Sequence, residues 1–169
     1  MSPSDSGSEI FYGETCAQRS VFLAGPTLRK PGAGWRRDAV GMLRAAGYQT
    51  DIVLPEWRHG EHDANKAALG WTSSDVVGWE HQNLEAASVI LFWMPFCLGE
   101  ASDPASLPGF TTRLELGLWL ARSPRKLVVG MPPECRLAVG AIRYYCRAAG
   151  DEIQNDLLTC VSAVTLKLM

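Results

Sequence analysis

The chain has 169 residues, of which 47% are hydrophobic and 20% charged, and its 16 Lys and Arg against 18 Asp and Glu give a formal net charge of −2. This length and apolar content fit one globular domain with a single core, and they exclude a disordered, collagenous or low-complexity chain. Without a basic excess, there is no electrostatic case for binding a nucleic acid polymer or an anionic membrane.

The first 18 residues are rich in Ser and Gly, and we expect them to form a loose tail ahead of one domain over residues 19–169. The N-terminus lacks the basic start and apolar run of a secretory signal, and no apolar run reaches the roughly 18 residues that span a bilayer. The five cysteines are widely spaced. We therefore expect reduced thiols and a cytoplasmic protein, with a catalytic thiol as a weaker alternative.

The first half of the expected domain alternates between strand and helix. Residues 20–25 form an apolar run ended by a Gly-Pro pair, which predicts a strand. Apolar residues at three-four spacing predict a helix over 34–46, and a second strand is expected over 48–54. Residues 55–73 are expected to be an irregular connection, and connections of this length are usually functional or mobile.

The second half continues the alternation. Its expected elements are a helix over 74–87 capped by Ser73 or Ser74, a strand over 88–94, a loop over 95–109, a helix over 111–122, a strand over 126–131, a helix near 137–149, a short strand near 151–155 and a C-terminal helix. The strands over 88–94 and 126–131 are nearly continuous apolar runs, which is typical of strands buried on both faces. The sequence therefore predicts an α/β fold in which helices cover both faces of a parallel sheet.

His59-Gly60-Glu61-His62-Asp63 gathers residue types that ligate metals. The segment lies in a polar, loop-like stretch and lacks the helical spacing of the zinc proteases. We interpret it as a solvated loop and expect no metal.

Glu115 is the only acidic residue in the leucine- and tryptophan-rich segment Gly109–Leu120. We place it in the first turn or so of a helix, where the helix dipole favours negative charge, and expect it to be ionised at neutral pH, as a nucleophile must be. Gly117 costs about 1 kcal/mol relative to Ala inside a helix, which suggests a close approach to the sheet. One helical face groups Thr111, Thr112, Glu115, Trp119 and Arg122, and a solvent-exposed face explains this spacing equally well.

Other candidates lie near the expected carboxyl ends of strands, where open α/β sheets bind ligands. The Gly25-Pro26 turn gives backbone N–H groups room to meet a polar ligand, although many such turns contain a Gly. Trp93 either stacks on a planar base or belongs to the core. The spacing around Glu80 leaves its exposure open.

The ordered set of these segments resembles the nucleoside 2-deoxyribosyltransferase superfamily, in the branch with a Phe-Leu-Ala-Gly-Pro-type opening. The matching segments are Val21–Thr27, Trp79-Glu80 with Leu84, Ile90–Pro95, Thr112–Gly117 and Val128–Gly130. The resemblance covers about residues 20–135. It implies a single-domain α/β fold with a five-stranded parallel sheet flanked by helices on both faces, flavodoxin- or Rossmann-like, and a homo-oligomeric enzyme.

By this resemblance, Glu115 matches the Glu of the family's Glu-Leu-Gly motif, the nucleophile that attacks the anomeric carbon of the sugar. Glu80 lies near the family's first pocket acid and is the second catalytic candidate. The resemblance implies no cofactor. The substrate-binding candidates are Phe22, Gly25, Pro26, Thr27, Trp93, Pro95 and Thr112.

The chain departs from the family pattern at several positions. Ser88 and Gly109 stand where many members carry Asp, and Glu100 or Asp103 are candidates to replace the second of these. The last residues, 167–169, lack the aromatic side chain with which classical members complete a neighbouring subunit's site.

The leading hypothesis is a cofactor-free enzyme that cleaves the N-glycosidic bond of a nucleoside or nucleotide, or transfers its (deoxy)ribosyl group, through a covalent glycosyl-Glu115 intermediate. The missing aspartates favour an alternative, a nucleotide-binding module without catalysis. A third hypothesis is a hydrolase of another ribosyl substrate, such as a dinucleotide. Arg29, Arg36 and Arg37 are candidates to hold a 5′-phosphate, with a solvated helix face as the alternative for them.

Overall fold

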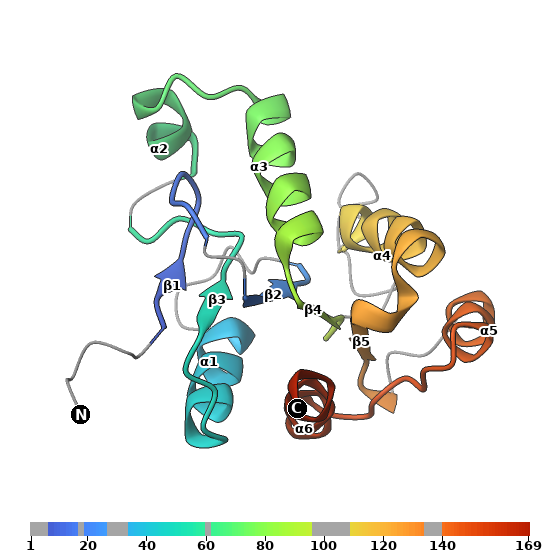
Figure 1. Ribbon diagram of the computed structural model, residues 1–169. Coiled ribbons are helices and arrows are strands. Elements are labelled where there is room, and N and C mark those ends of the chain that lie inside the picture. The colour runs from blue at the N-terminus through green and yellow to red at the C-terminus, as the bar shows by residue number, and fades with distance from the viewer. Residues whose placement is uncertain (1–6, 17–18, 27–33, 60–61, 96–108, 134–139) are drawn as a thin grey trace.

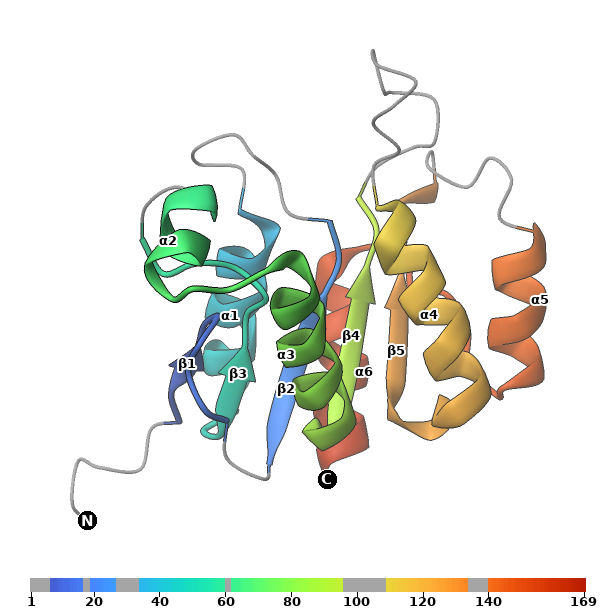
Figure 2. The same ribbon diagram turned by 90° about the horizontal axis from the view of Figure 1, so that it is seen from above.

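The computed structural model describes residues 7–16, 19–26, 34–59, 62–95, 109–133 and 140–169. Within these ranges the chain forms an α/β fold in which helices flank both faces of a five-stranded parallel sheet (Figures 1 and 2). The predicted fold class is therefore confirmed. None of the helices in these ranges is long and apolar enough to cross a membrane.

The sheet has the strand order β1-β3-β2-β4-β5. The strands are β1 (Glu9–Ile10), β2 (Ser20–Ala24), β3 (Asp51–Val53), β4 (Val89–Trp93) and β5 (Leu127–Gly130). After β2 the chain turns to one side to form β3, and after β4 it turns to the other side to form β5. The carboxyl ends of β2 and β4 therefore lie at a topological switch point, where sheets of this type bind ligands.

Alternation of side chains along β2 and β4 divides the core into two layers. Phe22, Ala24, Ile90 and Phe92 contribute to the layer under the helices α3 (Ser73–Ala86) and α4 (Phe110–Arg122). Val21, Leu23, Leu91 and Trp93 contribute to the layer under α1 (Trp35–Ala45) and α6 (Leu157–Leu168). Figure 2 shows the two helix pairs on opposite faces of the sheet.

Two short helices lie at the ends of the sheet. α2 (His62–Ala68) lies near the β1–β3 edge, and α5 (Gly140–Ala148) lies beyond β5 (Figures 1 and 2). A single 3-10 turn, η1 (Pro124–Lys126), leads from α4 into β5.

The N-terminal segment, residues 7–16, differs from the expected tail. β1 pairs with β3 through Glu9 opposite Ile52 and Ile10 opposite Val53, and Phe11 is buried beside it. The prediction of a loose tail over residues 1–18 is therefore wrong for residues 7–16, while 1–6 and 17–18 lie outside the described residues.

Three further elements differ from the sequence prediction: a connection, a helix cap and a short strand. The expected irregular connection over 55–73 contains α2, and Thr72 rather than a serine caps α3, through a reciprocal capping box with Asp75. The expected strand near 151–155 is reduced to one bridge between Gly130 and Gln154. Residues 134–139, at the start of the expected helix near 137–149, lie outside the described part of the chain.

Gly117 does not bring α4 close to the sheet, as the sequence had suggested. It is exposed, and a Cβ atom built there would meet no heavy atom within 4 Å. α4 instead packs on the core through Leu116 and Trp119.

We predict that Gly117→Ala raises the free energy of unfolding by about 0.5–1 kcal/mol, because Ala restricts the unfolded chain and its methyl group meets only open space. Gly130→Ala is the matched control. A Cβ atom at Gly130 would collide with Cys160 Sγ and lie 2.7 Å from Trp93 Cε3, so this variant should be less stable than wild type. Urea denaturation measures both, and a loss of stability in Gly117→Ala would contradict the prediction.

Candidate active site

Four ionisable side chains from four different segments interact near the switch point. Tyr12 comes from the N-terminal segment, Arg36 from the first turn of α1, Glu80 from α3 and Glu115 from α4. Tyr12 Oη donates a hydrogen bond to Glu80 Oε1. The charges of Arg36 and Glu80 act on Glu115, and those of Arg36, Glu80 and Glu115 act on Tyr12. The structure thus brings together both acids that the sequence proposed as catalytic.

Glu115 lies on an inward face of α4. Thr112 one turn earlier and Trp119 one turn later are both buried, and Glu115 itself is half-buried. The solvent-face interpretation is therefore wrong for Thr112, Glu115 and Trp119, whereas Thr111 and Arg122 are exposed. The first-turn placement is also wrong, because α4 begins at Phe110 and its first turn holds no acidic residue.

Burial raises the pKa of Glu115 to about 7, and the neighbouring Glu80 raises it further than Arg36 lowers it. The expectation of a fully ionised carboxylate at neutral pH is therefore wrong for this structure. A carboxyl group with this pKa exchanges its proton near neutrality, which is the range in which acid-base and nucleophilic carboxyl groups of enzymes operate.

Glu80 is half-buried in the middle of α3, and burial also raises its pKa. The hydrogen bond from Tyr12 and the charges of Arg36 and His62 oppose that rise. The charge of Glu80 in turn raises the pKa of Glu115, so ionisation of one acid opposes ionisation of the other.

Arg36 is the internal cation of the site and only 2% exposed. Its Nε donates to the carbonyl of Leu23 at 3.0 Å and its Nη2 to the carbonyl of Gly25 at 2.5 Å, so it braces the carboxyl end of β2. Its Nη1 lies 3.5 Å from Glu56 Oε2. Arg36 thus faces the interior rather than a solvated helix surface. Arg37 is exposed, and Arg29 lies outside the described residues.

An aromatic cluster that the sequence did not indicate lies beside Glu80. The ring of Tyr12 lies 4.9 Å from that of Trp57 and 5.1 Å from that of Trp79, measured between centroids. Trp71 lies 5.8 Å from Trp57, and Trp57 Nε1 donates to His62 Nδ1 at 2.9 Å. We call Tyr12, Trp57, Trp71 and Trp79 the aromatic cluster; all four are half-buried, so part of each remains accessible.

The expected base-stacking residue Trp93 has a different setting. It is 6% exposed and belongs to the core layer under α1 and α6, whereas Glu80 and Glu115 lie on the helices that cover the other face. The core interpretation of Trp93 is the one that the structure supports. Phe22 is also buried and belongs to the core layer between the sheet and the helices α3 and α4, which carry the two acids.

The remaining substrate-binding candidates lie around the end of β2 and the start of α4. A Cβ atom at Gly25 would come within 2.7 Å of the Trp35 ring, so only glycine fits the turn. Pro26 lies across from Gly109, where a Cβ atom would be 3.7 Å from Pro26 Cγ. Thr112 is buried, Pro95 is half-buried at the end of β4, and Thr27 lies outside the described residues. Their roles in binding stay predictions.

The thiols and histidines of the described residues form no second centre. Burial raises the pKa of Cys146 to about 11 and that of Cys160 to about 12, so both are protonated at neutral pH. No group of three or more His, Cys, Asp or Glu side chains in those same residues could hold a metal ion. Gly60 and Glu61 of the histidine-rich segment lie outside that part of the chain.

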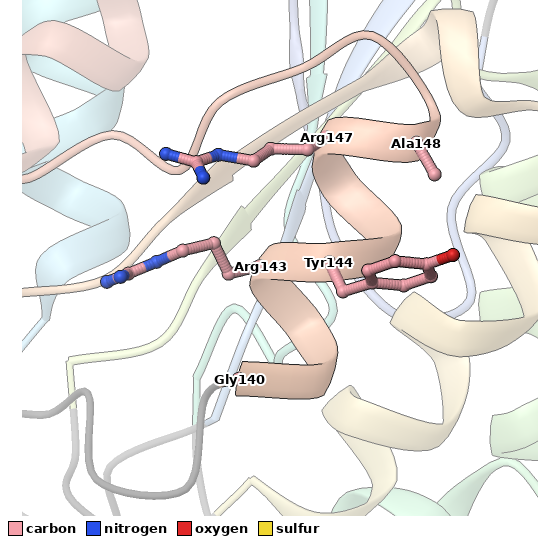
Figure 3. Close-up of a pocket in the computed structure, with 5 residues that line it drawn as sticks. All are labelled: Gly140, Arg143, Tyr144, Arg147 and Ala148. Atoms are coloured by element: carbon pink, nitrogen blue, oxygen red, sulfur yellow. The ribbon is translucent and has the colours of Figure 1, made fainter.

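A surface pocket of about 410 Å³ lies along α5 (Figure 3). Arg143 and Arg147 extend from one side of the helix, and Tyr144 projects from the other. Neither carboxyl group of the candidate site lines this pocket, so it is a separate surface feature.

The structure is a parallel α/β sheet with two interacting acids beside its switch point, the place at which sheets of this class bind small molecules. Comparison with protein families matches residues 18–135 to the family described as "Nucleoside 2-deoxyribosyltransferase like". The chain belongs to this family, and the family suggests ribosyl transfer or glycosidase activity on a small-molecule nucleoside. No curated protein matches the chain.

We predict that Glu115→Gln is more heat-stable than wild type at pH 8 and that this advantage disappears as pH falls to about 4.5. A carboxyl group whose folded pKa is raised stabilises the fold below its unfolded pKa and loses that contribution as pH rises through about 7. Thermal unfolding from pH 4.5 to 8 measures the difference. Glu85→Gln, an exposed acid on α3, is the control and should show no such trend; a constant difference between wild type and Glu115→Gln would contradict the prediction.

Proposed function

We propose that the protein breaks the N-glycosidic bond of a nucleoside or nucleotide by forming a covalent glycosyl ester on Glu115. The observation that carries this proposal is the half-buried Glu115, with its pKa raised to about 7, beside Glu80 in a chain of the 2-deoxyribosyltransferase-like family. The inward orientation of this face of α4 supports an accessible but partly desolvated nucleophile.

In the proposed first step, a carboxylate oxygen of Glu115 attacks the anomeric carbon of the sugar. The bond from that carbon to the base nitrogen breaks, its electron pair stays on the base, and Glu80 supplies a proton to the departing base. In the second step, a second base or water attacks the same carbon, the ester bond breaks and Glu80 recovers a proton. Two inversions give overall retention.

The proposed first step requires Glu115 to be ionised and Glu80 to be protonated. Burial raises the pKa of both acids, that of Glu115 to about 7, so near neutral pH Glu115 is protonated in part of the free protein and the reactive state is a fraction of the population. We expect a bell-shaped pH dependence of kcat/KM, with its acid limb set by ionisation of the pair and its alkaline limb by loss of the last proton.

The aromatic cluster supports a planar base as the leaving group. Trp57 and Tyr12 present half-buried rings within the same neighbourhood as Glu80, and rings of this kind pack well against a heterocycle. Transfer rather than hydrolysis requires that water be kept from the ester intermediate. We include in the proposal a cytoplasmic homo-oligomer; the free thiols of the described cysteines agree with a reducing compartment.

One observation favours a nucleotide-binding module without catalysis. The position at which many relatives carry Asp is Gly109, which serves as N-cap of α4 in a left-handed conformation with φ of 68°. A binder would show saturable affinity for a nucleotide and release no free base at any enzyme concentration.

We predict that Glu115→Gln lowers kcat by roughly a thousandfold or more, because the amide cannot form the ester. A panel of nucleosides, nucleotides and dinucleotides, analysed for free base by chromatography, measures turnover and separates the alternatives. Glu85→Gln is the matched control and should keep the wild-type rate.

Mass spectrometry of wild-type enzyme quenched during turnover tests the covalent step directly. The expected result is a mass increase of one sugar unit on the peptide that contains Glu115, and its absence in Glu115→Gln. Turnover by Glu115→Gln at the wild-type rate would exclude the nucleophile, and free base without any adduct would exclude the ester.

A further inference from the structure

We propose that Tyr12 is a positioning residue for Glu80, and that the N-terminal segment, residues 7–16, is the part of the chain that completes the site. This inference rests on the proposed function. The segment lies outside residues 18–135, the range that matches the family, so the family match does not account for it.

The backbone of the segment is fixed at both sides of Tyr12. Ile10 pairs in register with Val53, and Tyr12 N donates to the carbonyl of Glu56 at 3.1 Å. On the other side, Trp79 Nε1 donates to the carbonyl of Glu14 at 3.0 Å, which ties the segment to α3 one residue before Glu80.

A polar clamp holds the turn that follows Tyr12. Arg58 donates to both carboxylate oxygens of Glu14 at 3.0 Å, and Phe11 N donates to Glu14 Oε2 at 3.1 Å. Arg58 also lies over the ring of Phe11, 4.2 Å from its centroid. The clamp and the buried Phe11 ring together fix the segment against the strand edge.

The ring of Tyr12 has little freedom to turn. It packs between Trp57 and Trp79, with centroid separations of 4.9 and 5.1 Å, and these contacts direct its hydroxyl group to Glu80 Oε1. Burial raises the pKa of Tyr12 far above its ordinary value, so the phenol remains a neutral donor throughout the working pH range.

A donated hydrogen bond decides which oxygen of Glu80 can carry the proton. Because Tyr12 donates to Oε1, a protonated Glu80 carries its hydrogen on Oε2. Rotation of the carboxyl group would break the bond to Tyr12. The hydroxyl group of Tyr12 therefore presents a defined acidic oxygen to the departing base, without itself touching the reacting atoms.

The test compares Tyr12→Phe with Tyr48→Phe. The hydroxyl group of Tyr48 donates to the carbonyl of Asp51 at 3.3 Å and does not bond either acid of the site. Two substrates are used, an ordinary nucleoside, whose base needs a proton to leave, and a 4-nitrophenyl glycoside of the same sugar, whose leaving group does not. We expect Tyr12→Phe to lower kcat roughly 10- to 100-fold on the nucleoside and less than about threefold on the nitrophenyl glycoside. Tyr48→Phe should change neither.

The pH profile gives a second readout. Glu80 is faced by Tyr12 from the N-terminal segment, Arg36 from α1, His62 from α2 and Glu115 from α4. Loss of the Tyr12 hydrogen bond raises the pKa of Glu80, so the alkaline limb of kcat/KM moves to higher pH. A more protonated Glu80 repels Glu115 less, so the acid limb moves to lower pH.

A conservative replacement keeps the test decisive if Tyr12→Phe does not fold. Replacement of Tyr12 by 3-fluorotyrosine at this position alone keeps the ring and gives a stronger donor, so the alkaline limb should move to lower pH, opposite to the phenylalanine variant. When Tyr12→Phe is added to the Glu80→Gln variant, we expect kcat on the nitrophenyl glycoside to stay the same as in Glu80→Gln alone.

Equal losses of kcat on both substrates, or an unchanged pH profile in a folded Tyr12 variant, would overturn the positioning role. Failure of the proposed function has a different signature, since wild type itself would then release no base from either substrate.

Discussion

Burying two carboxyl groups beside each other is the constraint on which the site depends. Each would lose hydration as an anion, and the two anions would repel each other. Arg36, a buried cation, lowers the pKa of both acids, and Tyr12, a neutral donor, lowers that of Glu80 through its hydrogen bond. In the proposed reaction, this arrangement places an acid and a base beside each other.

The fold supplies the rigidity that this arrangement needs. Arg36 is held by carbonyl groups at the end of β2, Glu80 by the capped helix α3, and Glu115 by a helix anchored through Leu116 and Trp119. The two acids thus come from helices on one face of the sheet, whereas Arg36 comes from α1 on the other face and reaches the end of β2. The strand order brings these elements together at the point where the chain changes direction across the sheet.

Much of the architecture could be predicted from the sequence, because continuous apolar runs identify β2, β4 and β5 whatever their neighbours are. The side of the sheet on which Trp93 lies could also have been predicted. Adjacent residues of a strand point to opposite faces, so Trp93 must lie in the other core layer from Phe92. The side of α4 that packs inward was not predictable, because helical spacing groups residues without orienting the group. β1 has two residues and lies in a Ser- and Gly-rich segment, so neither its length nor its composition indicated that Tyr12 would reach Glu80.

The short strand β1 also has a consequence for the colloidal behaviour of the protein. Without it, β3 would be the outermost strand, with an open row of amide and carbonyl groups along its free margin. Such margins recruit strands from other chains, and very short terminal strands are one way in which natural sheets prevent this. Detachment of the same few residues would therefore expose the margin of β3 and make the protein prone to aggregate, and on the proposed function it would also lower turnover.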